Sequence, residues 1–378
     1  PEAGLTSSNY VIDGVDPLVN TIAFSDSAMK IGDTPTLTIV FSEAVAAFAS
    51  SADVTCGNGA LATMTTSDQI TWAGTFTPTD NIDDDSNICT VADSYTDTLG
   101  NGVGEAQSTV NYDIDSIEPT VTSVAISDAS VISGETPTVT VVLSEANSLF
   151  TNADITCGSG SVGALSTADV GITYTGTFTP TTNTEAGTNV CTVGTSWTDT
   201  AGNAPLAGLA SSNFAVDTLA PTVSSFTISD TTLKIGDTST LTITLSEANS
   251  LFTNADVTCD NGDVGALSVS GNVYTGTFTP TADVTDDSNT CAVGTDWTDT
   301  AGNTGVGATS SNYVIDNVDP LVTTIAMSSS ALKVGETTTL TIVFSEAVAA
   351  FASDSDVTCA NGALATMTTS DQITWAGT

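Results

Sequence analysis

The chain repeats itself with a period close to 100 residues. A proline at the start of each repeat recurs as Pro17, Pro119, Pro221 and Pro320, at intervals of 102, 102 and 99 residues. Solenoid repeats run only to roughly 20–50 residues, whereas a period near 100 suits one small globular domain. The sequence therefore predicts a row of about four similar domains.

The repeat also predicts where each domain begins and ends. Residues 1–13 match Gly305–Asp316, which end a repeat, and residues 320–378 match residues 17–75, which begin one. The chain thus reads as a segment of a longer protein. The predicted parts are the last strand of a preceding domain (1–15), domain 1 (16–116), domain 2 (117–218), domain 3 (219–317) and the first half of domain 4 (318–378).

A longer period overlies the shorter one. Residues 17–75 and 320–378 are nearly identical, and both contain FSEAVAAFAS and NGALATMTTSDQITWAGT. Three domains, or 303 residues, therefore form a larger unit. Recent duplication explains this period, and so does a fibre in which every third domain has an equivalent environment.

Alternating side chains indicate strands throughout each repeat. In the run TLTIVFSE, Leu37, Ile39 and Phe41 share one face of a strand. Short strands separated by turn residues, without helical periodicity over ten residues, indicate an all-β fold with two packed sheets. About seven strands are predicted in the first repeat, at 18–25, 36–43, 53–57, 60–66, 69–77, 87–92 and 107–114.

Two aromatic positions vary together between repeats. Trp72 and Tyr95 in the first repeat become Tyr174 and Trp197 in the second, and the third repeat follows the second. Exchanging one large ring for another at two sites conserves core volume, so we expect the two positions to touch. Gly74, on the same strand as Trp72, is expected to leave room for a neighbouring ring.

Two cysteines occur at the same places in every complete repeat, 32 to 34 residues apart. One pair per domain predicts one disulfide per domain and an oxidising compartment. Zinc is the alternative, but two cysteines without a histidine cannot fill a tetrahedral zinc site. The predicted disulfides are Cys56–Cys89, Cys157–Cys191 and Cys259–Cys291, with Cys359 left without a partner.

The charge of the chain argues against several functions. The 44 acidic residues face only three lysines, there is no histidine, and the net charge is −41. Nucleic acids and anionic membrane surfaces attract clustered cations, so neither is an expected partner. The sequence contains no run of about 20 apolar residues, so no membrane-spanning segment is predicted. Without histidine or arginine the usual general bases and oxyanion clamps are missing, so we expect no enzyme.

Short motifs recur in a fixed order in the repeats: DP-[LT]-V, K-[IV]-G-[DE]-T, T-[LV]-T-[IV]-x-[FL]-S-E-A, T-F-T-P-T and T-D-T-x-G-N. In this order they resemble bacterial Ig-like repeats, which build giant secreted surface proteins and biofilm adhesins. The resemblance covers the whole chain and implies tandem Ig-like β-sandwich domains. Unlike in antibody domains, Cys56 ends the predicted third strand and Cys89 lies in the sixth. These strands are neighbours in one sheet, so the disulfide should staple an edge of the sandwich.

The Ig-like arrangement implies that acidic residues meet at each joint between domains. The loops after the second and sixth strands lie at the same end as the entry linker. At the second joint they bring Glu145 and Asp199 to Asp115 of the linker. The linker acids Asp113 and Glu118 are further candidates, as is an acidic loop at 83–85.

Oxygen ligands that converge in this way suit Ca²⁺, and without a cation they would repel one another. The alternative is that these acids are solvated and cap the backbone amides of turns. The candidate calcium ligands are Asp13, Glu43 and Asp97 at the first joint, Asp115, Glu145 and Asp199 at the second, Asp217, Glu247 and Asp299 at the third, and Asp316 and Glu346 at the fourth.

The sequence therefore predicts an extracellular structural protein, a calcium-rigidified and disulfide-stapled stalk or filament of a cell-surface adhesin or fibre. Its expected partners are further copies of itself, side by side or end to end. The alternative is a carbohydrate- or protein-binding adhesin module, which should show one divergent domain with aromatic residues on an exposed loop. Lys30, Lys234 and Lys333 share one turn position, and we expect surface lysines there rather than isopeptide bonds.

Overall fold

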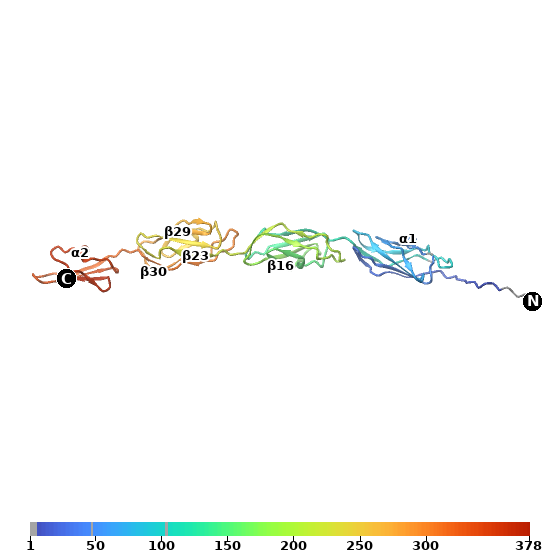
Figure 1. Cartoon of the computed structure of the whole chain (residues 1–378), viewed down its shortest axis with the longest axis horizontal. Coiled ribbons are helices and arrows are strands. Elements are labelled where there is room, and N and C mark those ends of the chain that lie inside the picture. The colour runs from blue at the N-terminus through green and yellow to red at the C-terminus, as the bar shows by residue number, and fades with distance from the viewer. Residues whose placement is uncertain (1–5, 47, 103–104) are drawn as a thin grey trace, which may run out of the picture. The chain divides into compact units, whose positions relative to one another are not determined.

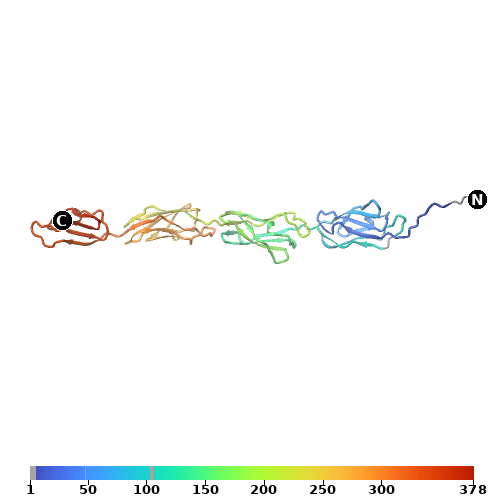
Figure 2. The ribbon, with the colours of Figure 1, turned by 90° about the horizontal axis from the view of Figure 1, so that it is seen from below.

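The computed structural model describes residues 6–46, 48–102 and 105–378. It consists of two compact units, one that ends at Leu219 and one that begins at Ala220. The first unit contains domains 1 and 2, and the second contains domains 3 and 4. Strands make up nearly all the regular structure of every domain (Figure 1), and the turned view in Figure 2 shows the same.

The elements follow the same order in each domain. Domain 1 contains β1 (Val19–Phe24), β2 (Ala28–Lys30), β3 (Thr36–Phe41), α1 (Ser50–Asp53), β4 (Val54–Cys56), β5 (Gly59–Leu61), β6 (Thr65–Thr66), β7 (Thr71–Pro78), β8 (Asp83–Asn87), β9 (Cys89–Val91), β10 (Gln107–Ser108) and β11 (Tyr112–Asp115). Domain 2 contains β12 (Val121–Ile126), β13 (Ser130–Ile132), β14 (Thr138–Leu143), η1 (Asn152–Asp154), β15 (Ile155–Cys157), β16 (Gly160–Val162), β17 (Ser166–Thr167), β18 (Thr173–Pro180), β19 (Glu185–Asn189), β20 (Cys191–Val193), β21 (Leu209–Ala210) and β22 (Phe214–Asp217). Domain 3 contains β23 (Val223–Ile228), β24 (Thr232–Lys234), β25 (Ser239–Leu245), η2 (Asn254–Asp256), β26 (Val257–Cys259), β27 (Gly262–Val264), β28 (Ser268–Ser270), β29 (Val273–Pro280), β30 (Thr285–Asn289), β31 (Cys291–Val293), β32 (Ala308–Thr309) and β33 (Tyr313–Asp316). Domain 4 contains β34 (Val322–Met327), β35 (Leu340–Phe344), α2 (Ser353–Asp356), β36 (Thr368–Thr369) and β37 (Thr374–Gly377).

Each complete domain is a β-sandwich. In domain 1, one sheet has the order β1-β3-β7-β5 with β6 beside β7, and the opposing strands form the sheets β10-β9-β4 and β2-β11-β8. Domain 2 repeats this plan. In domain 3 the pairing of Cys259 with Gly262 joins two of these sheets into one of eight strands. The last strand of each complete domain runs parallel to a short second strand, as β11 does to β2.

The alternating runs form the core strands, as predicted. Leu37, Ile39 and Phe41 of β3 are each at most 1% exposed. Two strands were not predicted, β2 and β8. The expected acidic loop at 83–85 is wrong, because Asp83–Asn87 is a strand that pairs with β11. Its sequence DDDSN has no apolar face, so pairing with a buried neighbour rather than side-chain pattern makes it a strand.

The covarying aromatic positions are coupled through a third ring. In domain 1 the Phe48 ring lies 5.2 Å from the ring of Trp72 and 5.9 Å from that of Tyr95, between centroids. In domain 2 Phe150 takes the same role toward Tyr174 and Trp197, at 5.1 and 5.4 Å. A larger ring on one side of this phenylalanine is therefore matched by a smaller ring on the other.

The expectation that Gly74 makes room for a ring is wrong. A Cβ at Gly74 would lie 2.8 Å from Cγ of Met64, so the space is taken by a methionine. The ring lies instead over the next strand, where a Cβ at Gly59 would fall 2.1 Å from Cζ of Phe76. Any side chain at Gly59 would displace that buried ring.

The structure contains the disulfides Cys56–Cys89, Cys157–Cys191 and Cys259–Cys291, and Cys359 is a free cysteine. Cys56 and Cys89 are direct cross-strand partners of β4 and β9. β4 lies at the end of the sheet β10-β9-β4, so this disulfide fastens a sheet edge in domain 1.

Candidate metal centre

Three carboxylates from separate parts of the chain meet where domain 1 passes into domain 2. Asp115 ends β11, Glu145 follows β14, and Asp199 lies between β20 and β21. Each offers an oxygen within 4.8 Å of the oxygens of the other two. Asp13, Glu43 and Asp97 form the equivalent group at the start of domain 1. The structure thus brings together both sets of candidate ligands that lie within the first unit.

The aspartate of the T-D-T-x-G-N motif is fixed by hydrogen bonds. Asp199 is 1% exposed, and its Oδ1 accepts bonds from the backbone N–H groups of Gly202 and Asn203, at 2.7 and 2.8 Å. Its Oδ2 accepts a bond of 2.9 Å from Nδ2 of Asn203. This carboxylate therefore caps a turn, as the alternative interpretation expected for the acids in general. The same bonds hold it in place as a rigid oxygen donor.

Asp97 caps the equivalent turn in domain 1. Its Oδ1 accepts bonds from the backbone N–H groups of Leu99, Gly100 and Asn101, and its Oδ2 accepts one of 2.7 Å from Nδ2 of Asn101. Burial acts to raise the pKa of Asp97, but these hydrogen bonds outweigh it and lower the pKa. Asp97 is therefore held in the charged form.

The glutamate of each group has a buried oxygen that lacks, within the described residues, the hydrogen bonds that hold the aspartates. Oε1 of Glu145 is buried, and it accepts no hydrogen bond from the residues that the structure describes. Burial, followed by the charges of Asp199, Asp115 and Asp83, raises the pKa of Glu145 to about 7. A buried carboxylate oxygen without a partner is costly, so this site favours either a proton or a cation.

Glu43 repeats this pattern in domain 1. Its Oε1 is also buried without a hydrogen-bond partner among the described residues. Desolvation and the charges of Asp13, Asp97 and Asp16 raise its pKa. The recurrence of an unsatisfied glutamate oxygen beside two aspartates makes it a property of the joint rather than of one domain.

Asp115 is the third member of the second group, and the neighbouring negative charges act on it as well. Burial raises the pKa of Asp115, and Asp199 and Asp83 add to the rise. Asp83 is the cross-strand partner of Asp115 in the pairing of β8 with β11. The linker acid Asp113 is not a member of the group of three, and it accepts a bond of 3.1 Å from Nδ2 of Asn111.

A set of hydrogen bonds crosses the same joint. Nδ2 of Asn203 donates to the main-chain oxygen of Asp115, and Oδ1 of Asn203 accepts from the N–H group of Ile31, at 2.9 and 3.0 Å. Nζ of Lys30 donates to the oxygen of Gly202 at 3.1 Å. Lys30 is therefore half-buried in an interdomain contact instead of the plain surface lysine we expected. The sequence analysis did not predict this contact, although the recurrence of the asparagine that ends T-D-T-x-G-N could have indicated it.

The remaining candidate ligands differ in their exposure to solvent. Asp217 ends β22 in the first unit and is half-buried. In the second unit, Asp299 is 1% exposed and its Oδ1 accepts a bond of 2.7 Å from the N–H group of Gly302, while Glu247 follows β25 and is half-buried. Asp316 ends β33 and is exposed. Oε1 of Glu346 is buried and has no hydrogen-bond partner within the described range.

The donors of both groups are hard oxygens. Hard divalent cations such as Ca²⁺ take six to eight oxygen ligands from carboxylates, carbonyls and water. The three carboxylates of each group, one of which belongs to a half-buried glutamate, fit such an ion. Soft metals prefer thiolate or imidazole ligands instead.

The fold and the repeated joints define a tandem Ig-like β-sandwich protein. The family model described as bacterial Ig-like domain (Big_12) matches residues 13–114, 115–216, 217–315 and 316–378, and the chain belongs to this family. The resemblance stated from the motifs and the all-β Ig-like fold are thereby confirmed. A comparison with curated proteins finds no match.

Among solved structures, the chain is similar to other multidomain chains at low identity. The I9–I11 tandem of titin shares 8% identity over 80% of this chain and 100% of its own length, with a TM-score of 0.29. The N-terminal eight Ig domains of the Down syndrome cell adhesion molecule share 11% over 82% and 38%, with a TM-score of 0.30. Domains 1–6 of the surface layer protein SbsC share 13% over 96% and 62%, with a TM-score of 0.20.

Among the helices in residues 6–46, 48–102 and 105–378, none has the length and apolar character needed to cross a bilayer.

Proposed function

We propose that this chain is an extracellular structural protein, a stalk or filament segment whose joints are stiffened by calcium and whose domains are stapled by disulfides. The observation that carries the proposal is the same three-carboxylate group at two successive joints, each with a buried glutamate oxygen that lacks a hydrogen-bond partner among the described residues. The disulfides and the bacterial Ig-like domains support an extracellular location.

Calcium would act on the joint through charge. Asp115 belongs to the linker, whereas Glu145 and Asp199 belong to the domain that follows it. Without a cation their mutual repulsion favours separation of linker and domain. A bound cation reverses the sign of that interaction and draws linker and domain together, so the angle between domains 1 and 2 becomes better defined.

The proposed role is structural rather than catalytic. Asp97 and Asp199 are committed to turn hydrogen bonds, and the carboxylate groups recur at equivalent places in successive domains. Such repetition suits a mechanical element, because each joint needs the same reinforcement. Several large aromatic side chains, such as Trp197 and Trp297, lie in domain cores, which favours the stalk over a sugar-binding surface.

Small-angle X-ray scattering of the whole chain tests this proposal. With calcium we expect a larger and more sharply defined maximum dimension than in calcium-free buffer. The variant E43Q/E145Q, which neutralises one acid in each group, should lose the response. The matched control E105Q/E118Q removes the same charge from outside the groups and should keep it. If the maximum dimension of the wild type were the same with and without calcium, the proposal would be overturned.

A further inference from the structure

Asn147 connects two of the segments that carry the carboxylates of the second joint. It is fully buried in domain 2, two residues after Glu145. Its Nδ2 donates a bond of 2.8 Å to the main-chain oxygen of Thr198, the residue just before Asp199. Its Oδ1 accepts a bond of 2.7 Å from the N–H group of Leu149. One side chain therefore ties the loop of Glu145 to the turn of Asp199.

The main chain of Asn147 is held as well. Its N–H group donates a bond of 3.0 Å to the main-chain oxygen of Gly171. Its main-chain oxygen accepts a bond from the hydroxyl of Tyr174, which stands at one of the two covarying aromatic positions. Domain 3 repeats the tie, because Nδ2 of Asn249 donates a bond of 2.7 Å to the oxygen of Thr298. The contact is therefore a feature of the repeat and not of domain 2 alone.

A valine takes the place of this asparagine in domain 1. Val45 lies in the run SEAVAAF, where domain 2 reads SEANSLF. Val45 forms an antiparallel main-chain bridge with Asp97. Domain 1 therefore ties the loop of Glu43 to the turn of Asp97 through its main chain, whereas domain 2 uses the side chain of Asn147.

The covariation of the two aromatic positions thus has a third member. A tyrosine at the first position supplies the hydroxyl that bonds to the main chain of the asparagine, whereas a tryptophan has no hydroxyl. Trp72 donates from its Nε1 to the main-chain oxygen of Gln69 instead, at 3.2 Å. The two sets are Val45, Trp72 and Tyr95 in domain 1, and Asn147, Tyr174 and Trp197 in domain 2.

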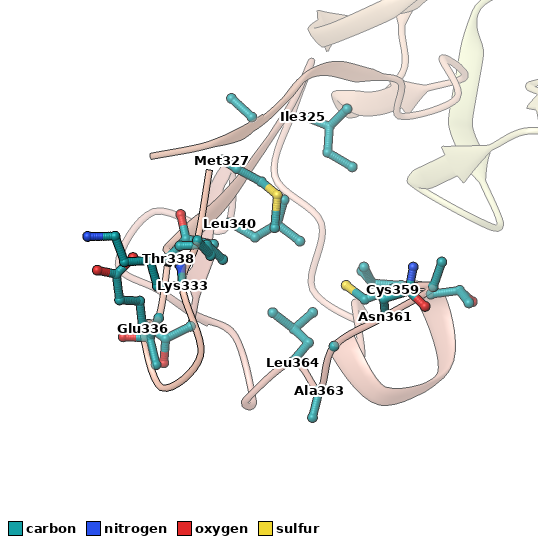
Figure 3. Close-up of a pocket in the computed structure, with 18 residues that line it drawn as sticks. Ile325, Met327, Lys333, Glu336, Thr338, Leu340, Cys359, Asn361, Ala363 and Leu364 are labelled. Carbon is teal, nitrogen blue, oxygen red and sulfur yellow. Dashed lines mark hydrogen bonds between the residues drawn. The ribbon is translucent and has the colours of Figure 1, made fainter. Parts of the chain in front are cut away.

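Domain 4 carries the valine of the first set, Val348. Its cavity of about 730 Å³ lies elsewhere in the domain. Figure 3 shows the side chains of Met327, Leu340 and Leu364 directed toward this space. Glu346 and Val348, both of which the structure describes, lie outside the lining of the cavity. The cavity therefore has no part in the arrangement of the joint loop.

We propose that Asn147 is a positioning residue for the calcium site of the second joint. Asn203 ties the turn of Asp199 to the linker at Asp115, and Asn147 ties the same turn to the loop of Glu145. The two asparagines thus connect all three segments that carry carboxylates before any ion binds. A ligand set that is held in place beforehand loses less freedom when the ion binds, so the affinity is higher.

A calcium titration of the whole chain, followed by hydrogen–deuterium exchange at residues 145–150 and 198–203, tests the proposal. These residues report the second joint by itself. N147V leaves all three carboxylates in the chain but removes the tie between them. Residues that orient metal ligands typically contribute about 10–100-fold to metal affinity, and we expect a loss of that size in N147V.

The matched control removes a different buried asparagine of domain 2. Asn189 is 7% exposed, and its Nδ2 donates to the main-chain oxygens of Ala186 and Phe214, at 2.9 and 3.3 Å. N189V therefore removes two buried hydrogen bonds that do not involve the joint, and it should keep the calcium affinity of the wild type. Equal weakening in N147V and N189V would overturn the proposal, because general destabilisation of domain 2 would then explain both.

A triple variant supplies the rescue. N147V/Y174W/W197Y gives domain 2 the set found in domain 1, which brings its own three carboxylates together. It should recover most of the affinity lost in N147V. A triple variant that melts like the wild type but binds calcium as weakly as N147V would contradict the proposed role.

The inference rests on the proposed function, and the titration separates the two. A wild type whose exchange is the same with and without calcium would overturn the proposed function and the role of Asn147 with it. A wild type that responds to calcium, together with an N147V variant that responds at the same concentrations, would overturn only the role of Asn147.

Discussion

The side-chain amide of Asn203 donates a 2.9 Å hydrogen bond to the main-chain oxygen of Asp115, across the joint between domains 1 and 2. Asn101 makes the same bond to Asp13 at 3.3 Å, and each pair is separated by 88 residues. Each asparagine also donates to the buried aspartate of its own turn. The loop that carries this aspartate is therefore tied to the linker by bonds that need no metal.

Removal of this asparagine should loosen the joint. N203A leaves the N–H group of Ile31 and one oxygen of Asp199 without their partner, so we expect a loss of about 1–3 kcal/mol in the stability of domain 2. Amide hydrogen exchange at Ile31, in domain 1, should become faster. N213A removes an exposed asparagine whose Nδ2 donates a bond of 3.3 Å to the oxygen of Gly187 within domain 2, and it serves as the control. Unchanged exchange at Ile31 in N203A would show that the bond does not hold the joint.

The substitution E145Q should have opposite effects with and without calcium. Without calcium it removes a buried charge that Asp115 and Asp199 repel, so domain 2 should melt at a higher temperature than in the wild type. With calcium it removes a ligand, so calcium should stabilise domain 2 less. Calorimetric melting in both buffers checks this crossing. If E145Q lowered the melting temperature equally in both, Glu145 would be an ordinary structural residue.

The pH dependence follows from the raised pKa of Glu145, about 7 in the folded state. The folded state holds this proton more tightly than the unfolded chain, so protonated Glu145 stabilises the folded state when calcium is absent. This stabilisation is complete below pH about 4.5 and is lost as the pH rises through about 7. Calcium binds the deprotonated form, so its affinity should fall as the pH drops below 7. Calcium titrations at pH 6 in buffers of different ionisation heat should reveal proton release in the wild type and less in E145Q.

The disulfides should stabilise each domain on its own. Closing a loop of 34 residues, as between Cys157 and Cys191, contributes about 3–4 kcal/mol in the chain-entropy model. Denaturant unfolding of C157S/C191S should show this loss in domain 2, with domains 1 and 3 unaffected. In the unfolded wild type without reductant, thiol titration should find only Cys359. Titration of six or seven thiols would contradict the assignment.

The sequence predicted those features that depend on side-chain pattern or spacing. Alternation in Leu37, Ile39 and Phe41 placed β3, because a strand with one buried face leaves that pattern. β8 left no such pattern, since DDDSN becomes a strand through its pairing with β11. Trp72 and Tyr95 vary together between repeats, and direct contact was expected from this covariation. Both rings contact Phe48, and a shared neighbour produces the same covariation as direct contact would.

The carboxylate groups show a similar division. The direction of successive strands was enough to bring Asp115, Glu145 and Asp199 to one joint. The sequence could not predict which of these acids accept hydrogen bonds and which lack a partner, because that depends on the local fold and on burial. Asp199 accepts bonds from its own turn, whereas Oε1 of Glu145 faces no donor among the described residues. The role of Asn203 in the joint was missed because its partners, Asp115 and Ile31, are distant in sequence.

Isothermal titration of calcium into the wild-type chain, E145Q and E118Q at pH 8 tests the central claim most directly. We predict that E118Q binds as many calcium ions as the wild type, because Glu118 lies outside the carboxylate group. E145Q should bind one calcium ion fewer, since it lacks the buried ligand of the second joint. The same stoichiometry and affinity in all three proteins, or no binding heat in the wild type, would contradict the account.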